Sequence, residues 1–110
     1  MVAAKARRYK VVVFVPAEAL ARVRGAMARA GAGVIGDYTR CSFAAKGVGT
    51  FRGGEGAHPA AGTAGRFEEV NEWRLEMVAG EEVVAAVVAA MKAAHPYEEA
   101  AYDVYRLEDF

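Results

Sequence analysis

The sequence has few of the residues that carry disulfides, metal sites or charge-driven binding. Its 110 residues include one cysteine and two histidines, and 14 lysines and arginines balance 14 aspartates and glutamates. Cys41 therefore has no partner for an internal disulfide, and we interpret it as a half-buried structural thiol. The formal net charge of zero argues against a partner held mainly by bulk charge, so no nucleic acid partner is expected.

The sequence also lacks a long apolar segment. No run approaches the length of about 18 residues that indicates a membrane helix, and the N-terminal residues do not resemble a signal peptide. We therefore expect a soluble, cytoplasmic protein without a membrane partner. Hydrophobic residues still make up 55% of the chain, which is enough material for one domain over residues 1–110.

The first third of the chain predicts a strand and a helix. Residues 9–15 are rich in valine and apolar on both pleat faces, as expected of a central strand that ends at Pro16. Over 17–30 the apolar residues recur every three or four positions, which predicts a helix. Gly31 and Gly33 should end it.

The middle of the chain predicts a hairpin, a loop and a strand. Residues 37–51 have strand character, and Lys46-Gly47 suits a reversal, so we expect a hairpin there. Residues 53–65 contain five glycines without apolar periodicity, which indicates a loop around His58. Residues 70–79 alternate between apolar and polar, as in a half-buried antiparallel strand.

A helix over 81–94 and a strand over 102–107 complete the predicted elements. Their order fits an α+β fold, a ferredoxin-like βαββαβ sandwich with two helices on one face of an antiparallel sheet. The other sheet face would expose an apolar patch. Small soluble domains usually bury such a patch by self-association, so we expect a homo-oligomer, a dimer or a trimer.

Four ordered blocks of residues resemble a known family. They lie at 9–16, at 31–38 with 41–43, at 47–51, and at 95–105, where the sequence reads HPYEEAAYDVY. Residues 9–107 thereby resemble the inserted domain of the Nif-three-like family, the dinuclear-metal-centre hexameric proteins, occurring as a stand-alone chain. Because that inserted domain is similar in fold to PII signalling proteins and CutA proteins, the resemblance implies a PII/CutA-like domain.

The resemblance does not imply the family's hydrolase chemistry. In the family the inserted domain lies near the metal centre of a larger host domain, and 110 residues cannot hold both parts. His58 and His95 are too few to supply the several histidines of that centre. One departure concerns the loop, where family members tend to have Gly-x-Asn-Pro and this chain has GAHP at 56–59.

The run at 95–105 suggests two alternatives. His95 and Glu98, with Glu99 or with His58 from a neighbouring loop, are candidates for a divalent metal, since imidazole and carboxylate suit first-row ions. The alternative, which we favour, is structural. Pro96 breaks the helix, His95 caps its last carbonyls, and the glutamates are solvated.

The glycine-rich loop also has two interpretations. Its backbone N–H groups could cradle a phosphate, with Arg52 and Arg66 flanking the loop and His58 within it. The alternative, which we favour, is a mobile connection between strands, because glycine-rich loops commonly serve as linkers and this one has no Walker A lysine pattern. No catalytic residues are assigned, since nothing places a base beside Ser42 or Cys41.

The hypothesis that we favour is a non-enzymatic, oligomeric binding or regulatory module with a small-molecule ligand. One alternative is a metal-binding protein or metal-dependent enzyme that uses His95 and Glu98. Another is a structural partner of a separately encoded dinuclear-metal protein.

Overall fold

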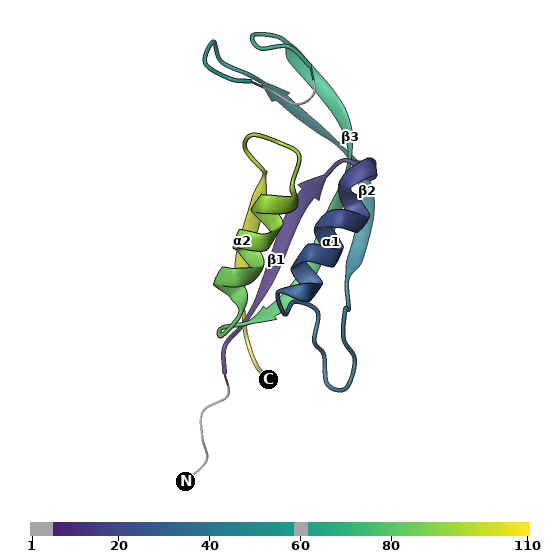
Figure 1. Cartoon of the computed structure of the whole chain (residues 1–110), viewed down its shortest axis with the longest axis vertical. Coiled ribbons are helices and arrows are strands. Elements are labelled where there is room, and N and C mark those ends of the chain that lie inside the picture. The colour runs from purple at the N-terminus through teal and green to yellow at the C-terminus, as the bar shows by residue number, and fades with distance from the viewer. Residues whose placement is uncertain (1–5, 59–61) are drawn as a thin grey trace.

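The computed structural model describes residues 6–58 and 62–110, which form a four-stranded antiparallel sheet with two helices on one face (Figure 1). The sheet order is β2-β3-β1-β4. This arrangement confirms the predicted ferredoxin-like α+β sandwich. The elements are β1 Arg8–Val15, a 3-10 turn Ala17–Ala19, α1 Leu20–Arg29, β2 Phe43–Arg52, β3 Phe67–Gly80, α2 Val84–Ala94 and β4 Tyr102–Leu107.

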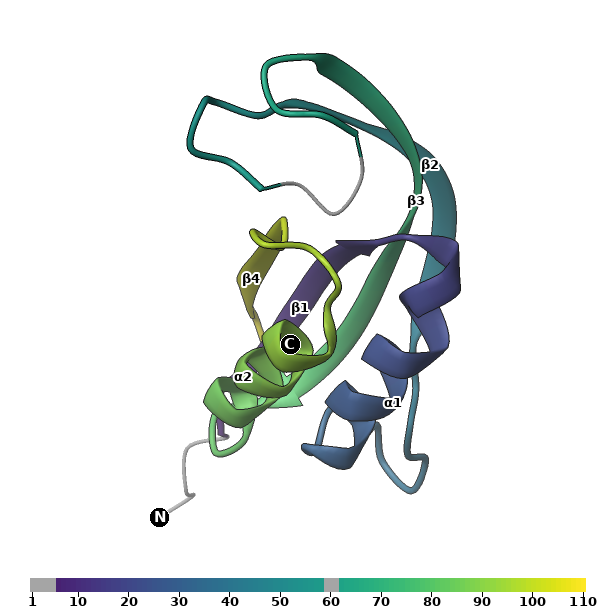
Figure 2. The ribbon, with the colours of Figure 1, turned by 45° about the horizontal axis from the view of Figure 1, so that its top comes forward.

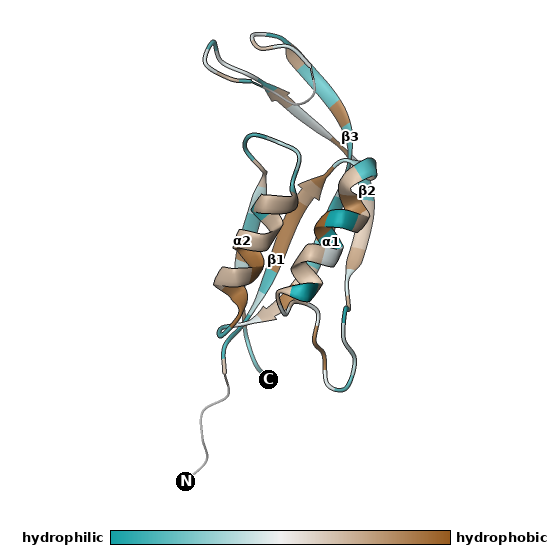
Figure 3. Ribbon diagram, in the orientation of Figure 1, coloured by the Kyte–Doolittle hydropathy of each residue, from teal (hydrophilic) through white to brown (hydrophobic). Residues whose placement is uncertain are grey.

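The core lies between the two inner strands and the helices. Because side chains alternate along a strand, Val11, Val13 and Val15 of β1 all point toward the helices, and none has exposed surface. Figure 3 shows apolar residues concentrated on β1, between α1 and α2. The central strand and the alternating strand were both predicted correctly. The other core residues are Ala19, Val23, Met27, Ala32, Leu75, Met77, Ala79, Val87 and Met91.

Helix α1 ends where the glycines predicted. The N–H of Gly31 donates to the carbonyl of Ala28, and the N–H of Ala32 donates to that of Met27. Gly31 has φ of 115°, a left-handed conformation that glycine adopts without the penalty of a Cβ. This pair of hydrogen bonds is a Schellman motif, which turns the chain away from the helix axis.

The predicted hairpin at 37–51 is wrong. One continuous strand, β2, runs through Lys46 and Gly47 and pairs along its whole length with β3. The chain reverses instead in the segment 53–66, of which residues 59–61 lie outside the described part of the chain. Between α1 and β2, the strand pairing seen among the described residues is one isolated bridge between Ile35 and Tyr38.

The packing around Gly49 explains why glycine occurs here inside a strand and not at a turn. Gly47 and Gly49 look like turn residues, but within β2 they pair with Glu72 and Val70 of β3. A Cβ at Gly49 would collide with the side chain of Glu72. Glycine in a strand interior often marks such a close approach.

The β2–β3 hairpin projects beyond the helices and gives the described chain a long axis of 58 Å against 23 Å for the other two. Its end curls over the sheet, so that the loop after β2 lies near the connection between α2 and β4 (Figure 2). We call these two connections loop 53–66 and segment 95–101. Their approach positions the candidate site.

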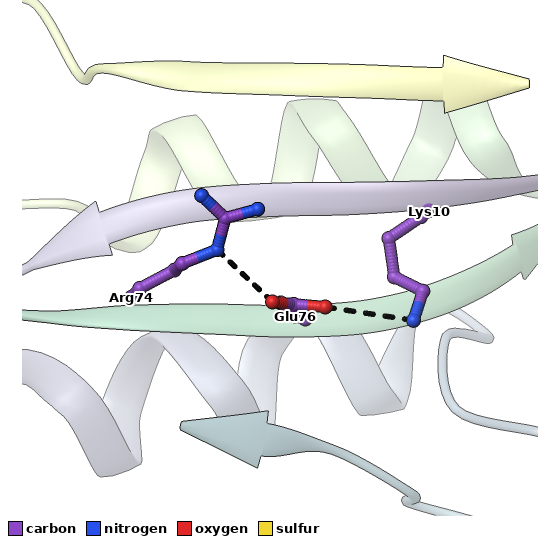
Figure 4. A network of polar contacts seen from close by, with 3 residues as sticks. All are labelled: Lys10, Arg74 and Glu76. Carbon is purple, nitrogen blue, oxygen red and sulfur yellow. Dashed lines mark hydrogen bonds and ion pairs between the residues drawn. The ribbon is translucent and has the colours of Figure 1, made fainter. Parts of the chain in front are cut away.

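The face of the sheet turned away from the helices, here the outer face, carries a polar network. Glu76 of β3 accepts a hydrogen bond from Arg74, with Nε to Oε2 3.0 Å, and pairs with Lys10 of β1 at 3.5 Å (Figure 4). The hydrogen bond from Arg74 holds the pKa of the Glu76 carboxyl below its usual value, and the charge of Lys10 adds to the effect. Phe43 and Tyr105 are exposed by 66% and 48%, and strand alternation and pairing put both on this face.

None of the helices that the structure describes combines the length and the apolar character needed to cross a membrane.

Candidate ligand pocket

Segment 95–101 begins where Pro96 forbids further helix. The residue before a proline is biased toward extended backbone, and His95 has φ of −73° and ψ of 136°. Its backbone N–H still donates to the carbonyl of Met91, which completes the last turn of α2. The segment then reaches β4 alongside the end of β1, where the N–H of Phe14 donates to the carbonyl of Ala101.

The imidazole of His95 is buried and both of its nitrogens have partners. Nε2 donates to the carbonyl oxygen of Phe14, 2.7 Å away, and Nδ1 accepts the backbone N–H of Tyr97 at 3.1 Å. A carbonyl only accepts and an N–H only donates, so these contacts fix a neutral ring with its proton on Nε2. The expectation that His95 caps the carbonyls of α2 is wrong, since Nε of Arg22 on α1 caps the Ala94 carbonyl at 2.9 Å.

These hydrogen bonds bear on the predicted metal site. A metal on His95 would require one ring nitrogen to give up its hydrogen bond. Among residues 6–58 and 62–110, no three His, Cys, Asp or Glu side chains are grouped closely enough to hold a metal ion. The site on His95, Glu98 and Glu99 stays a prediction.

Loop 53–66 is closed at its neck by hydrogen bonds. The N–H of Gly65 donates to the carbonyl of Gly53 at 2.8 Å, and Nε of Arg52 donates to the carbonyl of Gly65 at 3.0 Å. Gly65 has φ of 85°, which favours glycine. The glycines therefore build a defined neck for the loop.

Within the described part of the chain, one hydrogen bond joins the loop to segment 95–101. The backbone N–H of His58 donates to Oε2 of Glu98 across 2.7 Å, although the two residues lie 40 positions apart in the sequence. The carboxylate makes this a charge-assisted bond, which is stronger than one between neutral groups. The His58 backbone, rather than its imidazole, makes this contact.

A pocket of about 360 Å³ lies between these elements. Its size is within the range of about 300 to 1,000 Å³ that is usual for small-molecule sites. Apolar and aromatic side chains share its walls with three carboxylates and one guanidinium. The lining residues are Thr50, Phe51, Arg52, Gly53, Ala57, Glu72, Tyr97, Glu98, Glu99 and Ala101.

The next feature of the pocket is the phenolic hydroxyl of Tyr97. Its hydroxyl is buried and has no hydrogen-bond partner among the described residues. Burial raises the pKa of Tyr97 to about 12, and the negative charge of Glu72 acts in the same direction. Tyr97 is therefore a neutral hydrogen-bond donor at physiological pH.

The pocket brings together some of the predicted site residues and leaves others apart. Arg52, Glu98 and Glu99 line it, and His58 contacts it through Glu98. Arg66 points elsewhere, pairing with Glu68 at 3.9 Å with its side chain 75% exposed. His95 lies beneath the segment, bonded to β1.

Sequence reasoning missed Glu72 and Phe51 as pocket residues. Glu72 was assigned only to the polar face of a strand, and no local pattern marks it. Its signal is long-range, because the register of β2 against β3 pairs Glu72 with Gly47, and the missing side chain of Gly49 leaves room for the Glu72 carboxylate.

Known proteins resemble this chain over most of its length. It is 48% identical over 99 residues to a GTP cyclohydrolase 1 type 2 homolog of Bacillus subtilis, covering 90% of this chain and 26% of that protein. The protein of the same name from Mycobacterium tuberculosis is 50% identical over 98 residues, covering 89% and 26%. The crystal structure of a Bacillus cereus protein related to NIF3 superposes with a TM-score of 0.85 at 43% identity, covering 97% and 27%.

These relatives confirm the resemblance to the Nif-three-like family. The chain spans about a quarter of the length of the relatives that it matches. No protein-family model matches the chain. The homology therefore concerns one segment of Nif-three-like proteins.

The fold is shared more widely. CutA from Archaeoglobus fulgidus, a periplasmic divalent cation tolerance protein, superposes with a TM-score of 0.68 at 16% identity, covering 94% of this chain and 86% of that one. CutA1 from Oryza sativa gives 0.67 at 17% identity, covering 96% and 84%. At such identities the likeness establishes the fold alone, and confirms the predicted CutA-like architecture.

Proposed function

We propose that this chain is a non-enzymatic, oligomeric binding or regulatory module whose ligand occupies the pocket between loop 53–66 and segment 95–101. The observation that carries the proposal is the hydrogen bond from the His58 N–H to Glu98, which holds two distant segments against one cavity. Ligand sites are commonly concave, largely apolar and furnished with a few polar groups. Arg52 and the His58 backbone border this site from the loop.

The outer face of the sheet supports the oligomeric part of the proposal. No described helix covers it, and Phe43 at its edge is 66% exposed. Exposed aromatic side chains on an uncovered sheet face favour association with another copy of the chain. A closed dimer or trimer would bury that face.

Native mass spectrometry of the gently purified protein tests both parts in one spectrum. We expect an oligomer that retains a small organic molecule, in keeping with a pocket of this volume. A monomer that carries no extra mass would contradict the proposal. A retained metal ion without an organic molecule would support the alternative that uses His95 and Glu98.

A further inference from the structure

Charge is distributed unevenly around the pocket. Its charged lining residues are three glutamates, Glu72, Glu98 and Glu99, and one arginine, Arg52. The whole chain has no formal net charge, so this lining is acidic in an otherwise neutral protein. A concave site lined by one sign of charge concentrates ions of the opposite sign.

The pocket carboxylates are not neutralised by side chains that the structure describes. The ion pairs among residues 6–58 and 62–110 involve other acids, namely Glu68, Glu76 and Asp109. Nε of Arg52 is engaged by the Gly65 carbonyl. Glu98 accepts a hydrogen bond from a neutral backbone N–H. The pocket lining therefore holds three carboxylates against one guanidinium, and its negative charge exceeds its positive charge.

The remaining walls suit an organic molecule more than a bare metal ion. Phe51, Tyr97 and Ala101 give the pocket an apolar surface, and aromatic rings attract cations to their faces. The glutamates line one pocket, yet the described chain holds no group of three acidic, histidine or cysteine side chains with metal-site geometry.

We infer that the pocket binds an organic cation of metabolite size. Its ammonium or guanidinium group is held by Glu72 and Glu99, and its apolar body lies against Phe51 and Tyr97. This inference rests on the proposed function and gives the ligand its chemical class. The glycine-rich loop suggested an anionic ligand, a phosphate. The pocket favours a cation instead, since a phosphate would meet three carboxylates.

Three probes with the same aromatic body and different charge test the inference on the oligomer as purified. They are phenethylammonium, 2-phenylethanol and 3-phenylpropionate. Amide chemical shifts from two-dimensional NMR locate each probe, and isothermal titration gives its affinity. We expect the ammonium probe to shift the amides of 50–53 and 97–101 and to bind about tenfold more tightly than the alcohol, the gain of one charge-assisted hydrogen bond.

Matched variants identify the groups that hold the charge. Glu72→Gln and Glu99→Gln remove one negative charge each and keep the size of the side chain. Each should lower the affinity of the ammonium probe toward that of the alcohol, by up to about tenfold, and leave the alcohol unchanged. Glu108→Gln is the control, because it makes the same charge change on an exposed residue that does not line the pocket.

The outcomes separate this inference from the proposed function. Stronger binding of the propionate at the same amides would overturn the cationic ligand and leave a binding module in place. Equal affinities for the three probes would also overturn it, since charge would then play no part. Selective broadening of these amide signals by Mn²⁺, with loss of ammonium binding, would assign the carboxylates to a metal instead. The proposed function is tested separately by native mass spectrometry, where a monomer without extra mass would contradict it.

Discussion

The ring of His95 joins the end of α2 to the end of β1, through the hydrogen bond that Nε2 donates to the Phe14 carbonyl. The same ring receives the N–H of Tyr97 and so fixes the first turn of segment 95–101. The wall of the pocket is thus anchored to the central strand by a buried side chain.

His95→Ala should lower the free energy of unfolding by about 2 kcal/mol, because it removes two hydrogen bonds and leaves a small cavity. Urea denaturation measures the change. His58→Ala is the matched control, since the described contact of His58 uses only its backbone, and it should stay within about 0.5 kcal/mol of the parent. Unchanged stability of His95→Ala, with loss of stoichiometric metal, would contradict the structural role and favour the metal site.

Tyr97→Phe should keep or raise the free energy of unfolding, by up to about 1 kcal/mol, because it deletes a buried hydroxyl that has no partner among the described residues. Tyr38→Phe, on a side chain that is 75% exposed, is the neutral control. A clear loss of stability in Tyr97→Phe alone would mean that the hydroxyl has a partner in the assembled protein.

The buried side chain of Tyr97 also predicts how the free energy of unfolding depends on pH. The pKa of Tyr97 rises from 10.0 to about 12 on folding, so the folded state holds this proton more tightly than the unfolded chain. Its contribution to stability is complete below pH 10.0 and is lost as the pH rises through about 12. Chemical denaturation across this range should show a decline that is smaller in Tyr97→Phe. Equal declines in the two proteins would count against the raised pKa.

Gly33→Ala should cost about 3 kcal/mol or more. The residue has φ of 88°, and an added Cβ would lie 2.7 Å from the backbone N and O of Cys41, which must then move. Gly36→Ala, at φ of 57° with nothing within 4 Å of its Cβ, isolates the backbone term and should cost about 1 to 2 kcal/mol. Thermal unfolding distinguishes the pair, and equal losses would contradict the close packing of the two segments.

Phe43→Lys should dissociate the proposed oligomer, because it puts a charge on the uncovered outer face. Val48→Lys is the control on the same strand, since it is similarly exposed at 63% but lies on the opposite pleat face. Sedimentation velocity gives the subunit number of each variant. Dissociation by Val48→Lys alone would place the interface on the helix side of the hairpin.

The sequence alone predicted the elements whose local pattern matches their environment in the fold. Leu75 and Met77 alternate with polar residues because one face of β3 packs on the helices, and that period is visible in the chain itself. Gly31 marks a helix end because its positive φ is a local requirement. These elements needed no knowledge of distant contacts.

The errors and omissions arise where distant segments meet. Gly47 looks like a turn residue, and only its pairing with Glu72 across the hairpin identifies it as part of a strand. Arg52 and Glu98 could be named as candidates, but their shared pocket depends on how the hairpin curls over segment 95–101. Arg66, equally close to the loop in sequence, is directed to Glu68 instead.

The most direct test of the ligand pocket compares the native mass spectra of the parent protein and Ala57→Trp. Ala57 lines the pocket, so an indole there should fill much of it, while Phe43 does not line this pocket. Ala85→Trp, on an exposed position of α2, controls for the added side chain. We predict the same oligomer in all three proteins and a retained organic mass in the parent and in Ala85→Trp only. Retention of that mass by Ala57→Trp would contradict a ligand site between loop 53–66 and segment 95–101.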